Sequence, residues 1–262
     1  RFPLVLVGGD WDGGRQRALL ASSVTRLVMR GVIAQGAPDT TNAPQPELLS
    51  FSHSSELTLS RCGIAAFGQV GLFLSGCQDV ALRDLAFDAA PYVGSSPLAT
   101  RSALDVNDCE KVRVLRSHVA FDASATPSAA VSLHGDGLQF EDNLVETFAD
   151  AGTLRAWGGV HVRGGSRRVT LRRNRVSGGL GHGFTLGSVL FGANGLPPFT
   201  RREGPGRGHI DTSGPKPSVT GSLAGGFMDG GTPWRPRDEG SIEDLILTEN
   251  TVVGMGTNAI SA

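Results

Sequence analysis

Apolar residues recur along most of this chain in an eight-residue pattern, which we call the octet. In the octet at residues 169–176, the first, third and eighth residues are apolar and the sixth is Asn174. Apolar residues at alternate positions predict a β-strand, because successive side chains of a strand point to opposite faces. Seven octets start at residues 27, 57, 80, 112, 138, 169 and 245.

The octets recur at intervals of 23 to 32 residues, apart from a final interval of 76. A drifting period of this length is typical of a solenoid, in which the loops vary while the stacked strands do not. A second short apolar strand precedes most octets by seven to nine residues, as Leu104 and Val106 precede the octet at residue 112. We therefore predict an all-β solenoid of about seven or eight coils, each with at least two short strands.

Asparagine at the sixth octet position carries a resemblance to a known family. The repeat resembles the right-handed, single-stranded parallel β-helix of pectate-lyase-like proteins, in which an Asn at the turn after a strand stacks on its counterparts in neighbouring coils. Asn143 and Asn174 occupy this place one coil apart, and Asn250 joins them if the last interval is one coil with an insertion. The resemblance covers roughly residues 20–262 and implies the fold.

Two glycine-rich segments carry a second resemblance. Residues 178–187 and 250–260 are similar to segments of bacterial β-helix proteins from phage-tail-like and contractile-injection gene clusters. This resemblance implies a structural component of such a particle, with other particle subunits as partners and an extracellular or particle-associated location.

The domain organisation follows from the repeat. A solenoid has no internal boundary, so we expect residues 1–262 to form one domain. Residues 188–241 are rich in Gly and Pro and lack a lasting period, which predicts a loop-rich insertion that projects from the side of the coils. Both ends resemble cuts in a longer polypeptide, and neither a signal peptide nor a run of 18 apolar residues occurs.

Composition excludes some partners. The net charge of −1 gives no general attraction to nucleic acid or to a membrane surface. Glycine accounts for 37 of the 262 residues, which suits many tight corners. The three cysteines do not form a secreted disulfide framework, but Cys77 and Cys109 fall at matching places in successive coils. They are either stacked free thiols or a disulfide.

Charged residues at the fifth octet position alternate in sign. Stacked at the spacing of neighbouring strands, opposite charges attract by ~0.2–1 kcal/mol per pair, so we interpret this series as a structural device. In chain order the series reads Arg61, Asp84, Arg116, Asp142, Arg173 and Glu249.

Candidate catalytic residues lie outside this series. Asp105 is the outward residue of a strand, and Ser132, His161 and Thr185 hold the matching position in later coils. They predict a polar row down one outer face, which is either a solvated face or a catalytic groove. The catalytic candidates are Asp105 and His161 in the row and His134 and Asp136 at its corner.

Candidate ligand-binding residues are predicted in the loops. Glycan sites usually offer exposed aromatic side chains, which points to Trp11, Trp157, Trp234 and Tyr92. The ligand-binding candidates are Trp234, Arg235, Arg207, His182 and Trp157.

No metal site or cofactor is predicted, because the usual ligand spacings are absent. Asp10 and Asp12 resemble the start of a Ca²⁺ loop, but the completing Glu is missing, so a solvated turn is expected there.

Two functional hypotheses remain. The first is a non-catalytic β-helix that presents loops to a polysaccharide, a cell-surface glycan or another surface. The second is a polysaccharide lyase, glycoside hydrolase or uronate epimerase with an unfamiliar site, because no motif of the known β-helix enzymes is intact. Fold alone does not decide between them.

The charge series makes a testable prediction. Asp142→Arg places three like charges in line, with Arg116 and Arg173 on either side, so the melting temperature should fall. Thermal unfolding followed by circular dichroism measures the change. An unchanged melting curve would contradict the alignment of the octets.

Overall fold

The fold is described from a computed structural model over residues 2–14, 17–36, 47–65, 70–89, 102–122, 129–148, 158–179, 181–187, 241–255 and 259–261. These residues form 23 β-strands and no helix, so the all-β prediction is confirmed. None of the described segments is therefore a helix capable of crossing a membrane. The predicted insertion lies outside these residues, apart from residue 241.

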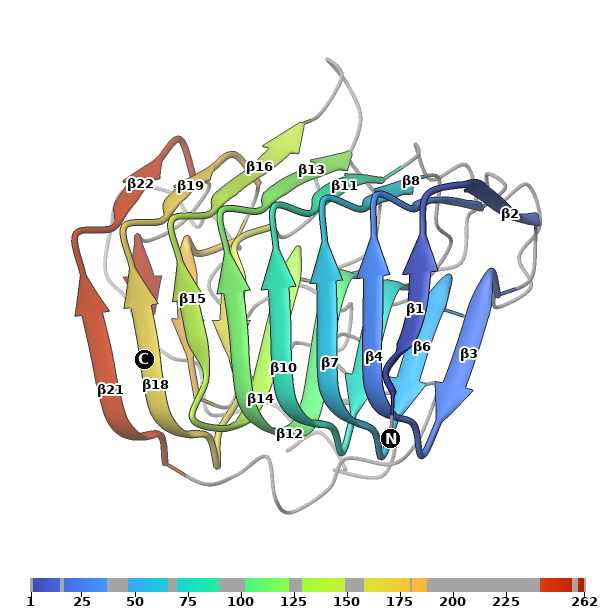
Figure 1. The fold of residues 1–262 in the computed structure, drawn as a ribbon. Coiled ribbons are helices and arrows are strands. Elements are labelled where there is room, and N and C mark those ends of the chain that lie inside the picture. The colour runs from blue at the N-terminus through green and yellow to red at the C-terminus, as the bar shows by residue number, and fades with distance from the viewer. Residues whose placement is uncertain are drawn as a thin grey trace, which may run out of the picture.

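The strands fall into three series, which repeat along the chain (Figure 1). The octet strands, formed by the first part of each octet, are β1 (Leu4–Val7), β4 (Thr25–Arg30), β7 (Ser55–Ser60), β10 (Gln78–Arg83), the second half of β12 (Ser102–Leu115), β15 (Gln139–Glu141), β18 (Arg167–Arg172) and β21 (Glu243–Thr248). The strands that precede them are β3 (Leu19–Ser22), β6 (Leu49–Ser52), β9 (Val70–Ser75), the first half of β12, β14 (Val131–Asp136), β17 (Val160–Val162), β20 (Phe184–Leu186) and β23 (Ile260–Ser261). These two series join into one 15-stranded sheet through β12 and β14.

The third series forms a separate eight-stranded sheet. Its strands are β2 (Asp10–Gly14), β5 (Ile33–Gly36), β8 (Gly63–Ala65), β11 (Ala86–Ala89), β13 (His118–Asp122), β16 (Leu144–Phe148), β19 (Arg175–Ser177) and β22 (Thr251–Val253). Most repeats therefore contribute three strands, where the alternating pattern predicted at least two.

Strands of one series pair in parallel and in the register that the octets predict. Leu27 pairs with Leu57, and Leu57 pairs with Val80. Val169 pairs with Leu245, so the last two octets are neighbours although 76 residues separate them. The predicted intervals are therefore confirmed, including the long one.

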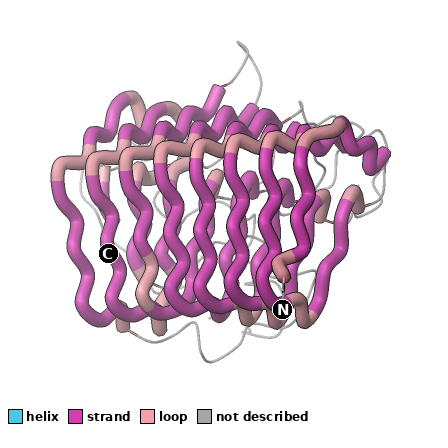
Figure 2. Tube along the Cα trace, in the orientation of Figure 1, coloured by secondary structure: helices cyan, strands magenta, loops and turns pink. Residues whose placement is uncertain are grey.

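Each octet bends between its two parts. The fifth residue has a left-handed backbone, with φ of 49° at Arg116, 57° at Asp142 and 53° at Arg173. The bend moves the chain from the 15-stranded sheet to the eight-stranded sheet, and Figure 2 shows these loop segments stacked in a line. A switch in the apolar positions, from the first and third to the eighth, is the sequence signal of this bend.

The charge series at the bend forms ion pairs, as predicted. Arg116 contacts Asp84 at 2.9 Å, and Arg173 contacts Asp142 at 2.6 Å. The hydrogen bond from Arg173 holds the pKa of the Asp142 carboxyl below its ordinary value. Both ends of the series differ from the prediction: Glu249 contacts Arg172 at 3.5 Å, and Arg61 forms no ion pair among the described residues.

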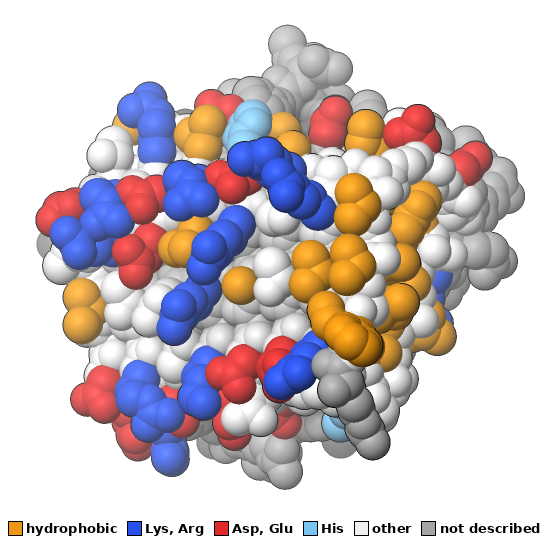
Figure 3. Space-filling model, viewed as in Figure 1, with side chains coloured by type: hydrophobic (Ala, Val, Ile, Leu, Met, Phe, Trp, Pro, Cys, Tyr) orange, Lys and Arg blue, Asp and Glu red, His pale blue; other side chains and the backbone are white. Residues whose placement is uncertain are grey.

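A second charge series lies at the other end of the octet strands, where none was predicted. Its members also have positive φ, and Arg26 contacts Glu56 at 2.7 Å while Lys111 contacts Asp79 at 3.4 Å. Figure 3 shows both series as rows of mixed sign that border the exposed face of the octet strands. In chain order the second series is Arg26, Glu56, Asp79, Lys111, Arg168 and Asp244.

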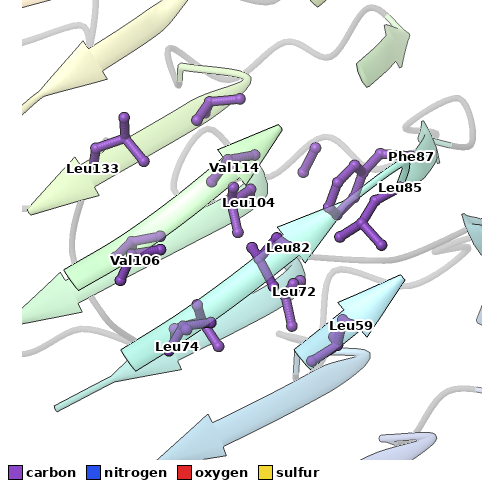
Figure 4. Close-up of a cluster of buried hydrophobic side chains, with 14 of the residues drawn as sticks. Leu59, Leu72, Leu74, Leu82, Leu85, Phe87, Leu104, Val106, Val114 and Leu133 are labelled. Carbon is purple, nitrogen blue, oxygen red and sulfur yellow. The ribbon is translucent and has the colours of Figure 1, made fainter. Parts of the chain in front are cut away.

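The core lies between the series and consists of the inward apolar positions (Figure 4). Leu72, Leu74 and Leu82 are fully buried, and Leu104 and Val106 continue the same stacks in the next repeat. Each fully buried aliphatic side chain contributes about 1.5–3 kcal/mol relative to an exposed one, so the stacks are the main source of stability.

The predicted asparagine stack is present. Asn174 Nδ2 donates to Asn250 Oδ1 at 2.9 Å and to the carbonyl oxygen of Phe140 at 2.8 Å. Asn174 Oδ1 accepts from the backbone N–H of Asn143 at 3.0 Å. Ser117 continues the column, because its N–H donates to Asn143 Oδ1 at 2.8 Å. Each amide therefore satisfies an N–H and a carbonyl oxygen of the preceding repeat, as Asn174 does for Asn143 and Phe140.

Two expectations for the first residues are wrong. The segment with Asp10 and Asp12 is strand β2 and not a solvated turn, because it pairs with β5. Trp11 is half-buried in the same strand and packs against the core, so it is not a loop aromatic. Leu4 and Leu6 pair with the apolar residues of the octet at residue 27, and Trp11 takes the eighth position. Residues 4–11 are therefore an eighth copy of the octet.

The asparagine stack makes a testable prediction. Asn174→Ala leaves the buried N–H of Asn143 and the Phe140 carbonyl without their partner, so the free energy of unfolding should fall by ~2 kcal/mol or more. Urea denaturation measures the change, with the exposed neighbour Arg175→Ala as the control. Equal stability of the two variants would show that the stack does not stabilise the fold.

Candidate functional site

The predicted polar row exists as a row. Asp105 is the register partner of Ser132, Ser132 of His161, and His161 of Thr185. In the other direction, Phe73 is the partner of Asp105. The strands β12, β14, β17 and β20 therefore bring together residues that are 80 positions apart in sequence, in the order that the alternation predicts.

The row is buried, and the expectation of a solvated face is wrong. The exposed fractions are 7% for Asp105, 1% for Ser132, 3% for His161 and 4% for Thr185. Strand alternation determines which face a side chain occupies but carries no information about what packs on that face. The polar groups of this row must therefore be satisfied inside the protein.

Arg163 neutralises Asp105. Its guanidinium lies 3.6 Å from Asp105 Oδ1, and both side chains are almost fully buried. The same nitrogen donates to the carbonyl oxygen of Val106 and to Oδ1 of Asn107, each at 3.0 Å. Arg163 directly follows β17 and reaches back two repeats to β12. This role of Arg163 was not predicted, because a single Arg after a strand usually faces solvent.

His161 is neutral at physiological pH. Its Nε2 lies 2.7 Å from the carbonyl oxygen of Gly187, so Nε2 carries the proton and donates it. The pKa of His161 is lowered to about 4, mainly by burial; the hydrogen bond to Gly187 opposes this shift, and the positive charge of Arg163 adds to it. The imidazole is therefore a fixed hydrogen-bond donor.

His134 and Asp136 lie at the corner of the row, as predicted, and both have partners. The N–H of Asp108 donates to His134 Nδ1 at 3.3 Å. A nitrogen that accepts is unprotonated, so the 3.9 Å separation between His134 and the Asp108 carboxylate is not a charge pair. Asp136 contacts Arg168 at 2.7 Å in the second charge series.

Ser132 lies between a carboxylate and an imidazole. Its Oγ is buried and has no hydrogen-bond partner among the described residues. Nucleophilic catalysis needs a base bonded to the hydroxyl, with a third group that orients the base. In a catalytic triad the histidine lies between the carboxylate and the serine. Here Ser132 lies between Asp105 and His161, and His161 donates to a backbone oxygen, so the three residues are not arranged as a triad.

The predicted ligand-binding residues fall into two groups. His182 is buried, and a Cβ added at Gly159 would overlap its backbone oxygen, so His182 sits in a tightly packed corner and not on a loop surface. The others lie outside the described residues: Trp234, Arg235, Arg207 and Trp157. Within the described ranges, no group of three or more His, Cys, Asp or Glu residues is placed to hold a metal ion.

Cys77 and Cys109 are free thiols stacked in adjacent repeats. The backbone N–H of Cys77 donates to Cys109 Sγ at 3.3 Å. A hydrogen bond between the two side chains lowers the pKa of Cys77 to about 7 and raises that of Cys109. The thiols replace the Ser54 hydroxyl that fills the same corner in the preceding repeat.

Comparison with protein-family models, with curated proteins and with solved structures finds no match to this chain. Its function must therefore be argued from its own residues.

The buried histidine makes a pH prediction. Because the folded pKa of His161 lies near 4 and its ordinary value is 6.5, the unfolded chain takes up a proton first as pH falls. The free energy of unfolding should therefore fall by roughly 2–3 kcal/mol from this group between about pH 7 and pH 4.5.

His161→Gln keeps a donor for Gly187 and removes the titrating group, so this part of the pH dependence should disappear. Urea denaturation at the two pH values measures it, with the half-exposed His118→Gln as the control. The pH prediction is wrong if the His161 variant and the wild type lose the same stability.

Proposed function

We propose that this chain is a right-handed parallel β-helix that acts as a rigid, non-catalytic scaffold and presents its surface to a glycan. The proposed fold joins the three strand series into coils, each of which follows one octet interval. The parallel register between every pair of neighbouring octets supports this arrangement.

Continuity of hydrogen bonds through the bends supports a rigid scaffold. The N–H of Arg116 donates to the carbonyl of Glu141 at 3.2 Å, and the N–H of Asp142 donates to that of Arg172 at 3.0 Å. The ladders therefore continue where the strands end, so that each coil is bonded to the next at its corner as well as along its strands. Such a stack resists bending because each coil contacts only its neighbours through many bonds.

One observation carries the non-catalytic proposal: the titratable groups of the polar row are used within the structure. Asp105 is held by Arg163, His161 by Gly187 and Asp136 by Arg168. A general acid or base must instead reach a substrate proton, and glycoside cleavage needs two carboxyl groups about 5–10 Å apart on a groove. In the described row Asp105 is the one carboxylate, and it is neutralised.

We also propose that the scaffold is part of a larger particle. The glycine-rich segments at residues 178–187 and 250–260 resemble those of phage-tail-like and contractile-injection proteins, which favours a particle component that contacts a cell-surface polysaccharide. Lack of a strong positive charge fits a glycan partner better than nucleic acid.

A polysaccharide panel tests the proposal. The protein should bind at least one polysaccharide while reducing-sugar release and unsaturated-uronate absorbance stay at background. Turnover that is lost in Asp105→Ala and kept in the exposed control Asp88→Ala would instead assign an enzyme with its site on the polar row.

A further inference from the structure

Two cysteines lie in consecutive repeats, at the corner that leads into the octet strands. Cys77 directly precedes β10, and Cys109 holds the matching place within β12. The next residues along the chain, Gln78 and Glu110, are register partners, so Cys109 lies beside Cys77. The two thiols are therefore stacked on each other in the same way as the apolar columns of the core.

The stacked thiols are in contact and buried. The backbone N–H of Cys77 donates to Cys109 Sγ at 3.3 Å, and a hydrogen bond also joins the two side chains. The exposed fraction is 1% for Cys77 and 0% for Cys109. Neighbouring strands lie ~4.8 Å apart, within the range of about 4.4–6.8 Å that separates the Cα atoms of a disulfide. The stacking of the strands is therefore compatible with a covalent bond between them.

The preceding repeat shows what this corner requires. Ser54 fills the same place there, where its hydroxyl accepts from the N–H of Val24 at 3.0 Å and donates to the carbonyl of Ser52 at 2.9 Å. The thiols make similar bonds at 3.3–3.6 Å, and a thiol is a weaker donor and acceptor than a hydroxyl. A pair of thiols offers instead what hydroxyls cannot, which is a covalent bond between two repeats.

Both cysteines lie directly beneath the surface. The residues that flank them in the chain are all exposed: Gly76, Gln78, Asp108 and Glu110. Gly76 has a left-handed backbone, with φ of 60°, at the corner itself. Local opening of this corner is enough to bring a small reagent to the sulfur atoms, without unfolding of the repeats.

We propose that Cys77 and Cys109 are a modification site, at which a low-molecular-weight disulfide oxidises the two thiols to a cross-link between adjacent repeats. The Cys77 thiolate attacks one sulfur of the reagent, forms a mixed disulfide and releases the other half as a thiolate. Cys109 then attacks the Cys77 sulfur, which forms the protein disulfide and releases the second half. The two protons of the cysteines pass to the released thiolates. Two protein thiols are thus oxidised, and one external disulfide is reduced to two thiols.

The order of attack follows from the acidity of the two thiols. The hydrogen bond with Cys109 lowers the pKa of Cys77 to about 7, whereas the same contact and burial raise the pKa of Cys109. The thiolate is the attacking form, so Cys77 reacts first. The cross-link is independent of the proposed glycan binding. It suits the extracellular or particle-associated location, because disulfides persist in oxidising surroundings.

Alkylation of the full chain tests the cross-link. The reduced, folded protein is treated with oxidised glutathione, the remaining thiols are alkylated in urea, and the number of alkyl groups is read from the intact mass. Cys62 is the internal control, because it is a buried thiol stacked between Val32 and Leu85. Cys62→Ser keeps the pair, whereas Cys77→Ser breaks it and supplies the hydroxyl that Ser54 has in the preceding repeat. Circular dichroism melting before treatment confirms that both variants are folded.

We expect one alkyl group in the treated wild type, none in Cys62→Ser and two in Cys77→Ser, because the chain has three cysteines. Trypsin should release residues 62–83 and 102–111 of the treated Cys62→Ser chain as one linked peptide. Treatment should also raise the Tm of Cys62→Ser by roughly 5 °C or more, since the cross-link restricts the unfolded chain. The cross-linked residues are 32 positions apart in the chain.

Three alkyl groups in the treated wild type, or a lasting mixed disulfide between Cys77 and glutathione, would overturn the inference. A cross-link that forms in urea but not in the folded protein would overturn it as well, since the fold then does not bring the sulfur atoms together. Loss of the reaction in Cys62→Ser would assign the bond to Cys62 and remove the proposed pair.

Discussion

In-register parallel stacking is the constraint on which the rest of this structure depends. Residues at the same position of neighbouring octets stack ~4.8 Å apart. A residue type is therefore favourable at a position only if it interacts well with the residues at that position in the adjacent repeats. Apolar residues such as Leu72 and Leu104 satisfy this condition by packing in columns. Charged residues at the bend satisfy it by alternating in sign, and Asn174 satisfies it by donating to Asn250 of the next repeat and accepting from Asn143 of the preceding one.

The same constraint explains why the residues of the polar row are poorly suited to catalysis. Asp105, Ser132 and His161 are stacked against one another by the register and are also buried, so their charges must be removed or paired. Arg163 pairs the carboxylate, and burial keeps the imidazole neutral. Hydrogen bonds from Arg163 to Val106 and from His161 to Gly187 then tie these side chains to the backbone near β12 and β17.

The outer face of the octet strands differs from the polar row because its charged groups are exposed to solvent. Charged residues of both signs form rows along its two borders, and several of them are joined in ion pairs. In the proposed function, the exposed surface binds the ligand and the buried polar row has a structural role.

The sequence by itself determined the strand class, the octet register, the asparagine stack and the sign alternation at the bend. These features are periodic, and a period is visible in the order of residues without knowledge of what surrounds them. It did not determine that the octet bends at its fifth residue, although the shift of the apolar position from odd to even carried that information. Only the tertiary structure decided that Asp105 and His161 are buried and that Arg163 reaches back to Val106. Burial depends on what packs against a face, and a contact across 57 residues depends on how repeats of unequal length stack, so neither is encoded in a local pattern.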